Sequence, residues 1–175
     1  MQNLVRKTIE LAKLNSSKTH FSFEKVNLFS VVDDVISANH ALFTNNDIIV
    51  QNNVPSVLPV YADQFHMQEV FMNLFNNAVK YTEGSGKITI DAKEIEEGVL
   101  ISVKDTGIGI AEDDIPHLFE EYYKADPSRH DFDSSGLGLP ICKRIIQRHH
   151  GKIWVESEGL GKGSTFYFTL SQPSD

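Results

Sequence analysis

Apolar residues recur at helical spacing in four segments of the chain. These segments cover residues 3–15, 28–44, 64–81 and 138–149, and each predicts an amphipathic helix. Asn27 and Asp63 precede two of them, where either side chain can cap a helix, and Pro140 is compatible with the first turn of the last. The helix at 3–15 is short, so we expect it to need a partner that buries its apolar side.

Segments with the residue pattern of β-strands lie between these helices, but strands and helices do not alternate strictly along the chain. Short strands are predicted at 21–26, 47–52 and 57–61. The last belongs at a sheet edge because it contains Pro59. Alternating apolar and polar residues predict two β-hairpins, at 87–105 around Gly98 and at 152–170. Together these elements predict an α/β fold, a two-layer sandwich with helices on one face of a mixed sheet.

Length and composition exclude several classes of protein and of binding site. A chain of 175 residues with 41% hydrophobic residues is long enough for one domain with its own core. The formal net charge of −8 argues against binding to nucleic acid, which needs a basic surface. The single cysteine, Cys142, cannot form an internal disulfide, and no Cys/His cluster has zinc spacing. No apolar run approaches a membrane span, so we expect a cytoplasmic protein whose membrane anchor, where it has one, lies outside this chain.

A polar stripe interrupts the apolar pattern of the helix at 64–81. Glu69, Asn73, Asn77 and Lys80 fall within an arc of about 80° on a helical wheel. Asn is unfavourable in the middle of a helix, yet Asn76 stands there as well. Amide groups suit a site shared by a magnesium ion and phosphates. A solvated helix face that happens to contain Asn explains the stripe equally well.

Two glycine loops offer close approach to a ligand. The loop 105–109 (DTGIG) follows a strand, and a carboxylate at a strand end, here Asp105, can accept a hydrogen bond from an exocyclic amine such as that of adenine. The loop 135–140 (SGLGLP) opens a helix, whose free N–H groups can bind an anion. An ordinary turn or loop explains either motif alone. The third glycine cluster, 159–164, lacks the spacing of a phosphate loop and is interpreted as a hairpin turn.

Four motifs stand in an order that resembles the sensor histidine kinases. They are NLFNNAVKYT (73–82), DTGIGI (105–110), LFEEYYKAD (118–126) and SSGLGLPI (134–141). They resemble the N, G1, F and G2 boxes of that family, and the resemblance covers about residues 22–172. It implies the GHKL ATPase fold, shared with type II topoisomerases, mismatch-repair ATPases and a heat-shock chaperone, with ATP and Mg²⁺ as ligands.

The resemblance also implies roles for the stripe residues. Asn77 corresponds to the magnesium-binding Asn, which bridges the ion to the triphosphate. Asn73 would lie near the phosphates, where the hydrolytic relatives carry a general-base Glu, and this replacement suits transfer to a protein rather than to water. Lys80 would contact phosphate, and Tyr81 would line the nucleotide pocket.

The loops complete the implied site. Asp105 would bind the adenine amine, and the rest of the first loop would shape its pocket through Thr106, Gly107, Gly109 and Ile110. The second loop would support the phosphates and the hinge of a lid through Ser135, Gly136, Leu137, Gly138 and Leu139. Phe119 would anchor this lid, at about 110–135, whose composition predicts mobility and whose short apolar helix is expected at 115–123. Lys124 stands where many relatives carry an Arg directed at the terminal phosphate, and it keeps the charge without the planar fork.

None of the seven histidines lies in the sequence context of a family phosphoacceptor. We therefore interpret residues 1–20 as the remnant of a dimerisation helix and linker, and 21–173 as the catalytic ATP-binding domain. The resemblance implies a protein-histidine kinase that transfers the γ-phosphoryl group of ATP to a histidine absent from this chain. A response regulator receiver domain would be its partner. The chain alone is expected to be a monomer that binds ATP with little autophosphorylation, and the full-length protein a homodimer.

Two other functions compete with this interpretation. A serine kinase of the anti-sigma type shares the ATP-binding fold, but the F box and the dimerisation-helix remnant argue against it. A nucleotide-sensing or scaffold domain would bind ATP without transferring phosphate, or would bind no nucleotide at all. The intact Asn77, Asp105, Gly107 and Gly136 argue against decay, and only Lys124 favours this third function.

Overall fold

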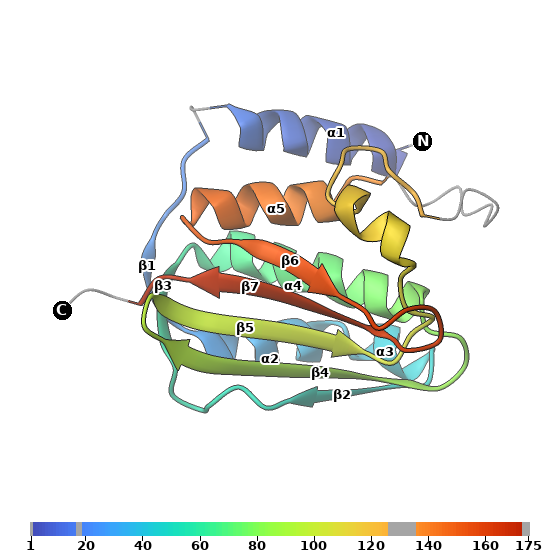
Figure 1. Cartoon of the computed structure of the whole chain (residues 1–175). Coiled ribbons are helices and arrows are strands. Elements are labelled where there is room, and N and C mark those ends of the chain that lie inside the picture. Colours follow the sequence, from blue (N-terminus) through green and yellow to red (C-terminus); the bar gives the residue numbers. More distant parts are fainter. Residues whose placement is uncertain (1, 17–18, 126–135, 173–175) are drawn as a thin grey trace.

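A five-stranded mixed sheet forms the centre of the fold (Figure 1). The computed structural model describes residues 2–16, 19–125 and 136–172. In spatial order the strands are β2 (Ile48–Asn52), β4 (Gly86–Ile95), β5 (Gly98–Asp105), β7 (Ser164–Leu170) and β6 (Ile153–Glu156). The β2 and β4 strands run parallel, and all other neighbours are antiparallel. Both predicted hairpins, β4–β5 and β6–β7, are confirmed.

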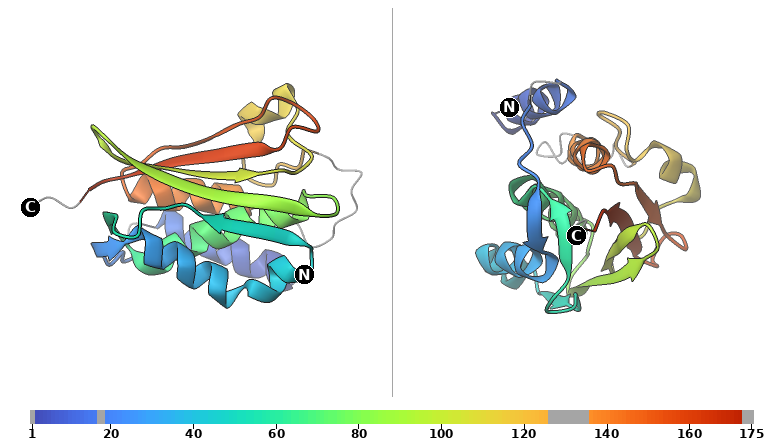
Figure 2. Two further views of the ribbon diagram at one scale, coloured as in Figure 1. Left: turned by 90° about the horizontal axis from the view of Figure 1, so that it is seen from below. Right: turned by 90° about the vertical axis from the view of Figure 1, so that its left-hand side faces the viewer.

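Three helices cover one face of this sheet. They are α2 (Leu28–Ala38), α4 (Gln64–Lys80) and α5 (Gly138–Arg148), and they lie on the same side in Figure 1 and in both views of Figure 2. The predicted two-layer α/β sandwich is therefore confirmed. The first helix, α1 (Gln2–Asn15), lies outside these layers and packs on α5, where Leu11 and Leu14 are buried.

A second, two-stranded sheet pairs β1 (Glu24–Asn27) with β3 (Pro59–Ala62). Pro59 is the first residue of its strand, as expected for a residue that cannot donate a ladder hydrogen bond. The backbone N–H of Tyr61 donates to the carbonyl of Ser171 at 3.0 Å, just after β7. This bond ties the small sheet to the end of the large one.

The core lies between the large sheet and its helices. Phe71 and Phe75 of α4 are fully buried in one core cluster with inward-facing residues of the central strands, such as Ile101 and Phe168. The rings of Phe71 and Phe168 meet edge to face with their centres 5.7 Å apart. Burial of these large side chains is the main favourable contribution to folding, and it fixes α4 across the sheet.

Three local predictions need correction. The single helix expected at 28–44 is divided into α2 and α3 (His40–Thr44) at Asn39, whose side-chain amide donates to the Val35 carbonyl at 2.8 Å and competes with the helical backbone. The helix expected at 115–123 is a 3₁₀ turn, η1 (Glu112–His117), that contains Pro116. Asn27 does not cap α2 with its side chain, which instead accepts from the Leu58 N–H at 3.2 Å.

The other predicted cap is confirmed, since the Asp63 carboxylate accepts a hydrogen bond from the backbone N–H of His66 at 2.9 Å. No helix in the described ranges is both long enough and apolar enough to span a membrane.

Candidate functional site

Asp105 ends β5 in a buried position, and its carboxylate is fixed by groups on two other segments. The backbone N–H of Gly107 donates to one oxygen at 2.8 Å, and the backbone N–H of Ser164 donates to the same oxygen at 3.2 Å. The Ser164 hydroxyl donates to the other oxygen. A carboxylate offers about four lone-pair sites, so Asp105 keeps acceptor capacity for a ligand amine.

The turn after Asp105 locks β5 to the end of α4. The Ile108 N–H donates to the carbonyl of Tyr81 at 2.8 Å. A Cβ atom on Gly107 would lie 2.5 Å from that carbonyl oxygen, so this close approach requires glycine. Thr106 joins the turn to β4, because its hydroxyl accepts from the Lys87 N–H at 2.9 Å.

Gly109 and Ile110 join the same turn to the β6–β7 hairpin. Gly109 has a φ of +72°, and a Cβ atom there would lie 2.1 Å from the carbonyl oxygen of Gly159. The Ile110 N–H donates to the Ser157 hydroxyl at 3.0 Å. Only glycine combines this left-handed backbone with so close a contact. The first predicted loop is thus a rigid wall built from β5, α4 and the hairpin.

The polar stripe of α4 runs from this wall toward the start of α5. Asn73 is buried, whereas Asn77 and Lys80 are half-buried and Asn76 is exposed. The side chain of Asn77 makes no hydrogen bond to any residue that the structure describes, and the Lys80 ammonium lies 4.9 Å from the centre of the Tyr81 ring. At the helical rise, Tyr81 and Asn73 are about 12 Å apart along α4, a length that an extended nucleoside triphosphate can span.

The start of α5 meets the far end of this stripe. A Cβ atom on Gly138 would lie 3.3 Å from the Asn73 side-chain oxygen, so α4 and the first turn of α5 are close together there. The first N–H groups of a helix have no partner within it and point outward. Leu137 anchors this turn, because it is fully buried, and Leu139 is half-buried.

Gly136 fixes the chain just before α5. Its φ is +65°, and its carbonyl accepts from the Tyr122 N–H at 3.0 Å, so both flanks of segment 126–135 are tied together. Phe119 packs edge to face on Phe166 with ring centres 6.5 Å apart. Lys124 is exposed. Ser135 and residues 126–134 of the predicted lid lie outside the described residues, so the mobility of the lid stays a prediction.

The sequence interpretation missed one residue of this region. The ammonium of Lys7, on α1, donates to the Asn73 side-chain oxygen at 3.3 Å. Burial lowers the pKa of Lys7 from its ordinary value. The one signal available in the sequence was spacing, because Lys7 stands on the same side of the helix as Leu11 and Leu14.

A groove of about 850 Å³ opens beside this contact, between α1, α2 and α4. Lys7 and Asn73 line it, and Asp105 does not. Within the described part of the chain, no three His, Cys, Asp or Glu side chains gather into a metal-binding cluster. A magnesium ion at Asn77 would therefore depend on oxygens from phosphate and water, which is usual for this ion.

Comparison with known proteins identifies the family of this chain. Residues 62–174 match the model of the family described as histidine kinase-, DNA gyrase B-, and HSP90-like ATPase. The adaptive-response sensory kinase SasA of Microcystis aeruginosa is 33% identical over 97% of this chain. The sensor histidine kinase WalK of Bacillus subtilis is 35% identical over 97% of it. The chain spans 44% of that SasA and 28% of WalK.

Solved histidine kinase structures share the fold. Full-length ShkA in complex with AMPPNP superposes with a TM-score of 0.85 and 27% identity, over 98% of this chain and 36% of that one. The histidine kinase ThkA in complex with the response regulator protein TrrA superposes with a TM-score of 0.79 and 26% identity, over 98% of this chain and 47% of that one. In both cases the superposed part includes α1, because nearly all of this chain is covered.

Proposed function

The chain belongs to the histidine kinase-, DNA gyrase B- and HSP90-like ATPase family, and we propose that it is the ATP-binding catalytic domain of a sensor histidine kinase. One observation carries the proposal. Asp105 is buried beside the Tyr81 end of α4, Asn77 is half-buried on α4 itself, and the first turn of α5 lies beside Asn73, about 12 Å from Tyr81 along the helix, a spacing that fits a nucleoside triphosphate. The known complex of ShkA with AMPPNP supports ATP as the ligand.

The base would bind at the rigid wall. Asp105 accepts a hydrogen bond from the adenine amine, and Thr106, Gly107 and Gly109 shape the pocket beside Tyr81. The phosphates extend along α4 past Lys80 toward Asn73. They end at the free N–H groups of Gly138 and Leu139, where the helix dipole favours negative charge.

Asn77 would hold a magnesium ion. A half-buried amide oxygen without a partner among the described residues is a suitable ligand, and the lack of a carboxylate cluster there leaves room for phosphate oxygens and water. The ion, when bound, neutralises charge on the phosphates. Asn73 stands where a general base would activate water, and an amide cannot take up a proton, which favours transfer to a protein over hydrolysis.

The acceptor would be a histidine on a dimerisation segment outside this chain. The bond between the γ-phosphorus and its bridging oxygen breaks, ADP leaves, and a new bond forms to a ring nitrogen of that histidine. Lys124 supplies positive charge to the transferred group. The phosphoryl group then passes to an Asp of a response regulator receiver domain, as the ThkA–TrrA complex suggests by analogy. The full-length protein would be a homodimer acting in the cytoplasm, with residues 1–20 as its dimerisation-helix remnant.

Calorimetric titration of ATP, with and without magnesium, tests the nucleotide site. We expect Asn77→Ala to weaken binding about tenfold in the presence of magnesium and little in its absence, because only the ion-mediated contact is lost. Asn76→Ala is the matched control, since it removes the same side chain from an exposed position one residue away. Equal behaviour of the two variants would contradict the assignment of Asn77, and lack of ATP binding by the unmodified chain would contradict the proposed function.

A further inference from the structure

Three elements meet at the Lys7 ammonium. Lys7 comes from α1, its hydrogen-bond acceptor Asn73 comes from α4, and a Cβ atom on Gly138, the first residue of α5, would lie 3.7 Å from the Lys7 nitrogen. The ammonium therefore stands beside the helix start at which the phosphates are expected. Residues that precede the ATPase family match, 62–174, contribute a positive charge to that place.

The Glu10 carboxylate attracts this charge from a longer range, and no closer carboxylate compensates it among the described residues. Lys7 is half-buried, and burial lowers its pKa. Its hydrogen-bond acceptor is a neutral amide, and within the described ranges no carboxylate lies at ion-pair distance from the ammonium. A partly desolvated cation with a neutral partner gains from a nearby anion. A phosphate group at the start of α5 would supply one.

The direction of the site indicates which phosphate this is. The adenine end is fixed by Asp105 and by the contact between Gly107 and Tyr81. Asn73 lies about 12 Å from Tyr81 along α4, so the phosphate farthest from the base would be the one that reaches Asn73. We propose, on the premise of the proposed function, that Lys7 binds the terminal phosphate of ATP, so that α1 distinguishes a triphosphate from a diphosphate.

The backbone of α1 is held in place independently of this contact. Leu11 and Leu14 are buried in the main core cluster. Arg144 donates from Nε to the Leu14 carbonyl at 3.2 Å. Arg148 donates to the carbonyls of Ser16 and Thr19 at 3.2 and 2.8 Å, so two arginines of α5 hold the end of α1 and the segment after it.

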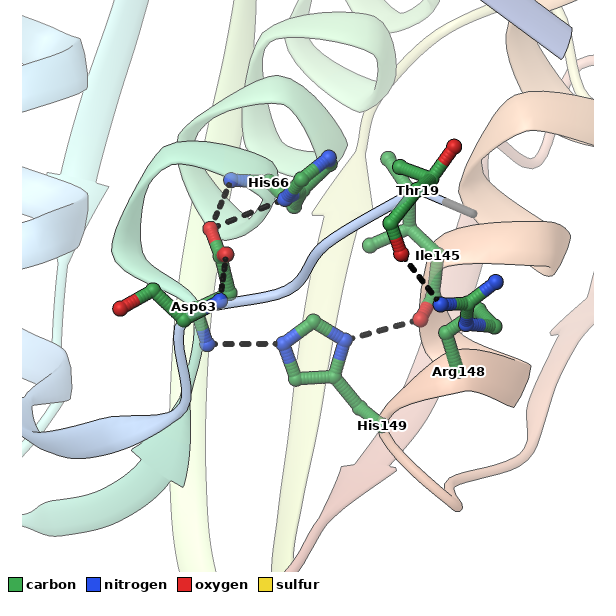
Figure 3. Close-up of polar contacts among 7 residues, drawn as sticks. Thr19, Asp63, His66, Ile145, Arg148 and His149 are labelled. Atoms are coloured by element: carbon green, nitrogen blue, oxygen red, sulfur yellow. Dashed lines mark hydrogen bonds and ion pairs between the residues drawn. The ribbon is translucent and has the colours of Figure 1, made fainter. Parts of the chain in front are cut away.

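The segment that follows α1 is held by ring contacts and by hydrogen bonds, and Figure 3 shows the hydrogen bonds around Asp63, Arg148 and His149. The Phe21 ring lies under the Arg148 guanidinium at 4.7 Å and stacks on His66 with ring centres 4.0 Å apart. The Ser22 N–H donates to the Asp63 carboxylate at 2.7 Å, and the Asp63 N–H donates to Nε2 of His149 at 3.0 Å. These contacts fix the segment that follows α1, whereas buried Leu11 and Leu14 and the bond from Arg144 fix α1 and thereby the position of Lys7.

Binding of the terminal phosphate and docking of α1 are coupled by thermodynamic linkage. A terminal phosphate that binds Lys7 stabilises the docked position of α1, and docking of α1 tightens ATP binding by the same factor. ADP lacks that phosphate and gains nothing from Lys7. Transfer of the γ-phosphoryl group would therefore weaken the docking of α1 on the catalytic domain.

The test compares ATP with ADP by calorimetric titration with magnesium. We expect Lys7→Met, which keeps the apolar stem, to weaken ATP binding about tenfold and ADP binding less than about twofold, as for loss of one charge-assisted hydrogen bond. Lys7→Arg should restore most of the difference. Lys13→Met is the control, since Lys13 is exposed on the same helix.

The outcomes separate this inference from the proposed function. ATP binding by the unmodified chain with no change in Lys7→Met, or an equal loss for both nucleotides, would overturn the role of Lys7 alone. An equal effect of Lys13→Met would mean that any positive charge on α1 acts in the same way, and it would also overturn the specific role of Lys7. Absence of ATP binding by the unmodified chain would overturn both. Amide exchange gives a second readout, in which ATP should protect α1 more than ADP does, except in Lys7→Met.

Discussion

The two ends of the candidate site are built differently. At the adenine end, Asp105, Gly107 and Gly109 are locked to one another and to α4 by backbone hydrogen bonds, all within residues 62–174 that match the ATPase family. At the phosphate end, Asn73 and Gly138 are completed by a lysine from α1, which lies outside that range. The proposed site for the base is thus preformed within the domain, whereas the proposed site for the terminal phosphate depends on how a neighbouring helix docks.

The largest expected effect is at the adenine end. Asp105→Asn replaces one acceptor oxygen by a donor that faces other donors, so ATP and ADP affinity should both fall about 100-fold, or about 2.7 kcal/mol. Titration of both nucleotides measures the effect. Asp91→Asn, at an exposed position on β4, is the control and should bind as the unmodified chain does. A loss confined to ATP would contradict the contrast between the two ends.

Rigidity of the adenine end is tested at Gly109. Gly109→Ala places a methyl group against the Gly159 carbonyl, so the free energy of unfolding should fall by about 2 kcal/mol or more. Gly161 is the matched position, because its φ of +78° is similar and a Cβ atom there meets nothing within 4 Å. Urea unfolding of both alanine variants should show a clearly smaller loss for Gly161→Ala, about 1 kcal/mol. Equal losses of stability would mean that the close approach of Gly109 to the Gly159 carbonyl does not restrict this position to glycine.

The smallest expected effect is on the pH dependence of the free energy of unfolding, and it arises from His149. His149 is buried and neutral, because Nε2 accepts from the Asp63 N–H while Nδ1 lies 2.8 Å from the Ile145 carbonyl, an acceptor, and must carry the proton. Burial lowers its pKa, although the Ile145 carbonyl and Asp63 oppose this shift. The unfolded chain then binds the proton more readily, so stability is present above about pH 6.5 and is lost as the pH falls below it.

We expect the free energy of unfolding to fall by about 1 kcal/mol between about pH 7.5 and pH 5.5. His149→Gln should remove this part of the slope, whereas His150→Gln, at the exposed neighbour, should keep it. Burial alone would raise the pKa of Asp63, but hydrogen bonds from His66 and Ser22 lower it overall, so Asp63 loses its contribution only below about pH 4. An unchanged slope in His149→Gln would contradict the assignment.

Prediction from the sequence succeeded where one local rule decided the outcome. The period of apolar residues in α4 placed Phe71 and Leu74 in the core, and the alternation in 87–105 produced the β4–β5 hairpin. It failed where neighbours competed with the local rule. Asn39 divides a continuous apolar pattern because its amide bonds to Val35, and the side chain of Asn27 holds the Leu58 loop instead of capping a helix.

The candidate site shows the same division. Motif order singled out Asp105, Asn77 and Gly138 as candidates, because each stands in a local pattern of strand end, helix face or helix start, and their roles in binding stay predictions. Lys7 could not be found in that way, since its hydrogen-bond partner lies 66 residues away in the chain.

The sequence by itself therefore determined the fold class, the four motifs and the absence of a matching phosphoacceptor, because periodicity and residue spacing are local properties of the chain. Only the tertiary structure decided that α1 packs on α5, that Arg144 and Arg148 hold it there, and that an ammonium reaches Asn73. Contacts of this kind depend on how elements that are distant in the sequence pack against one another. Their energies come from burial and from charges brought together across the chain, which no local pattern records.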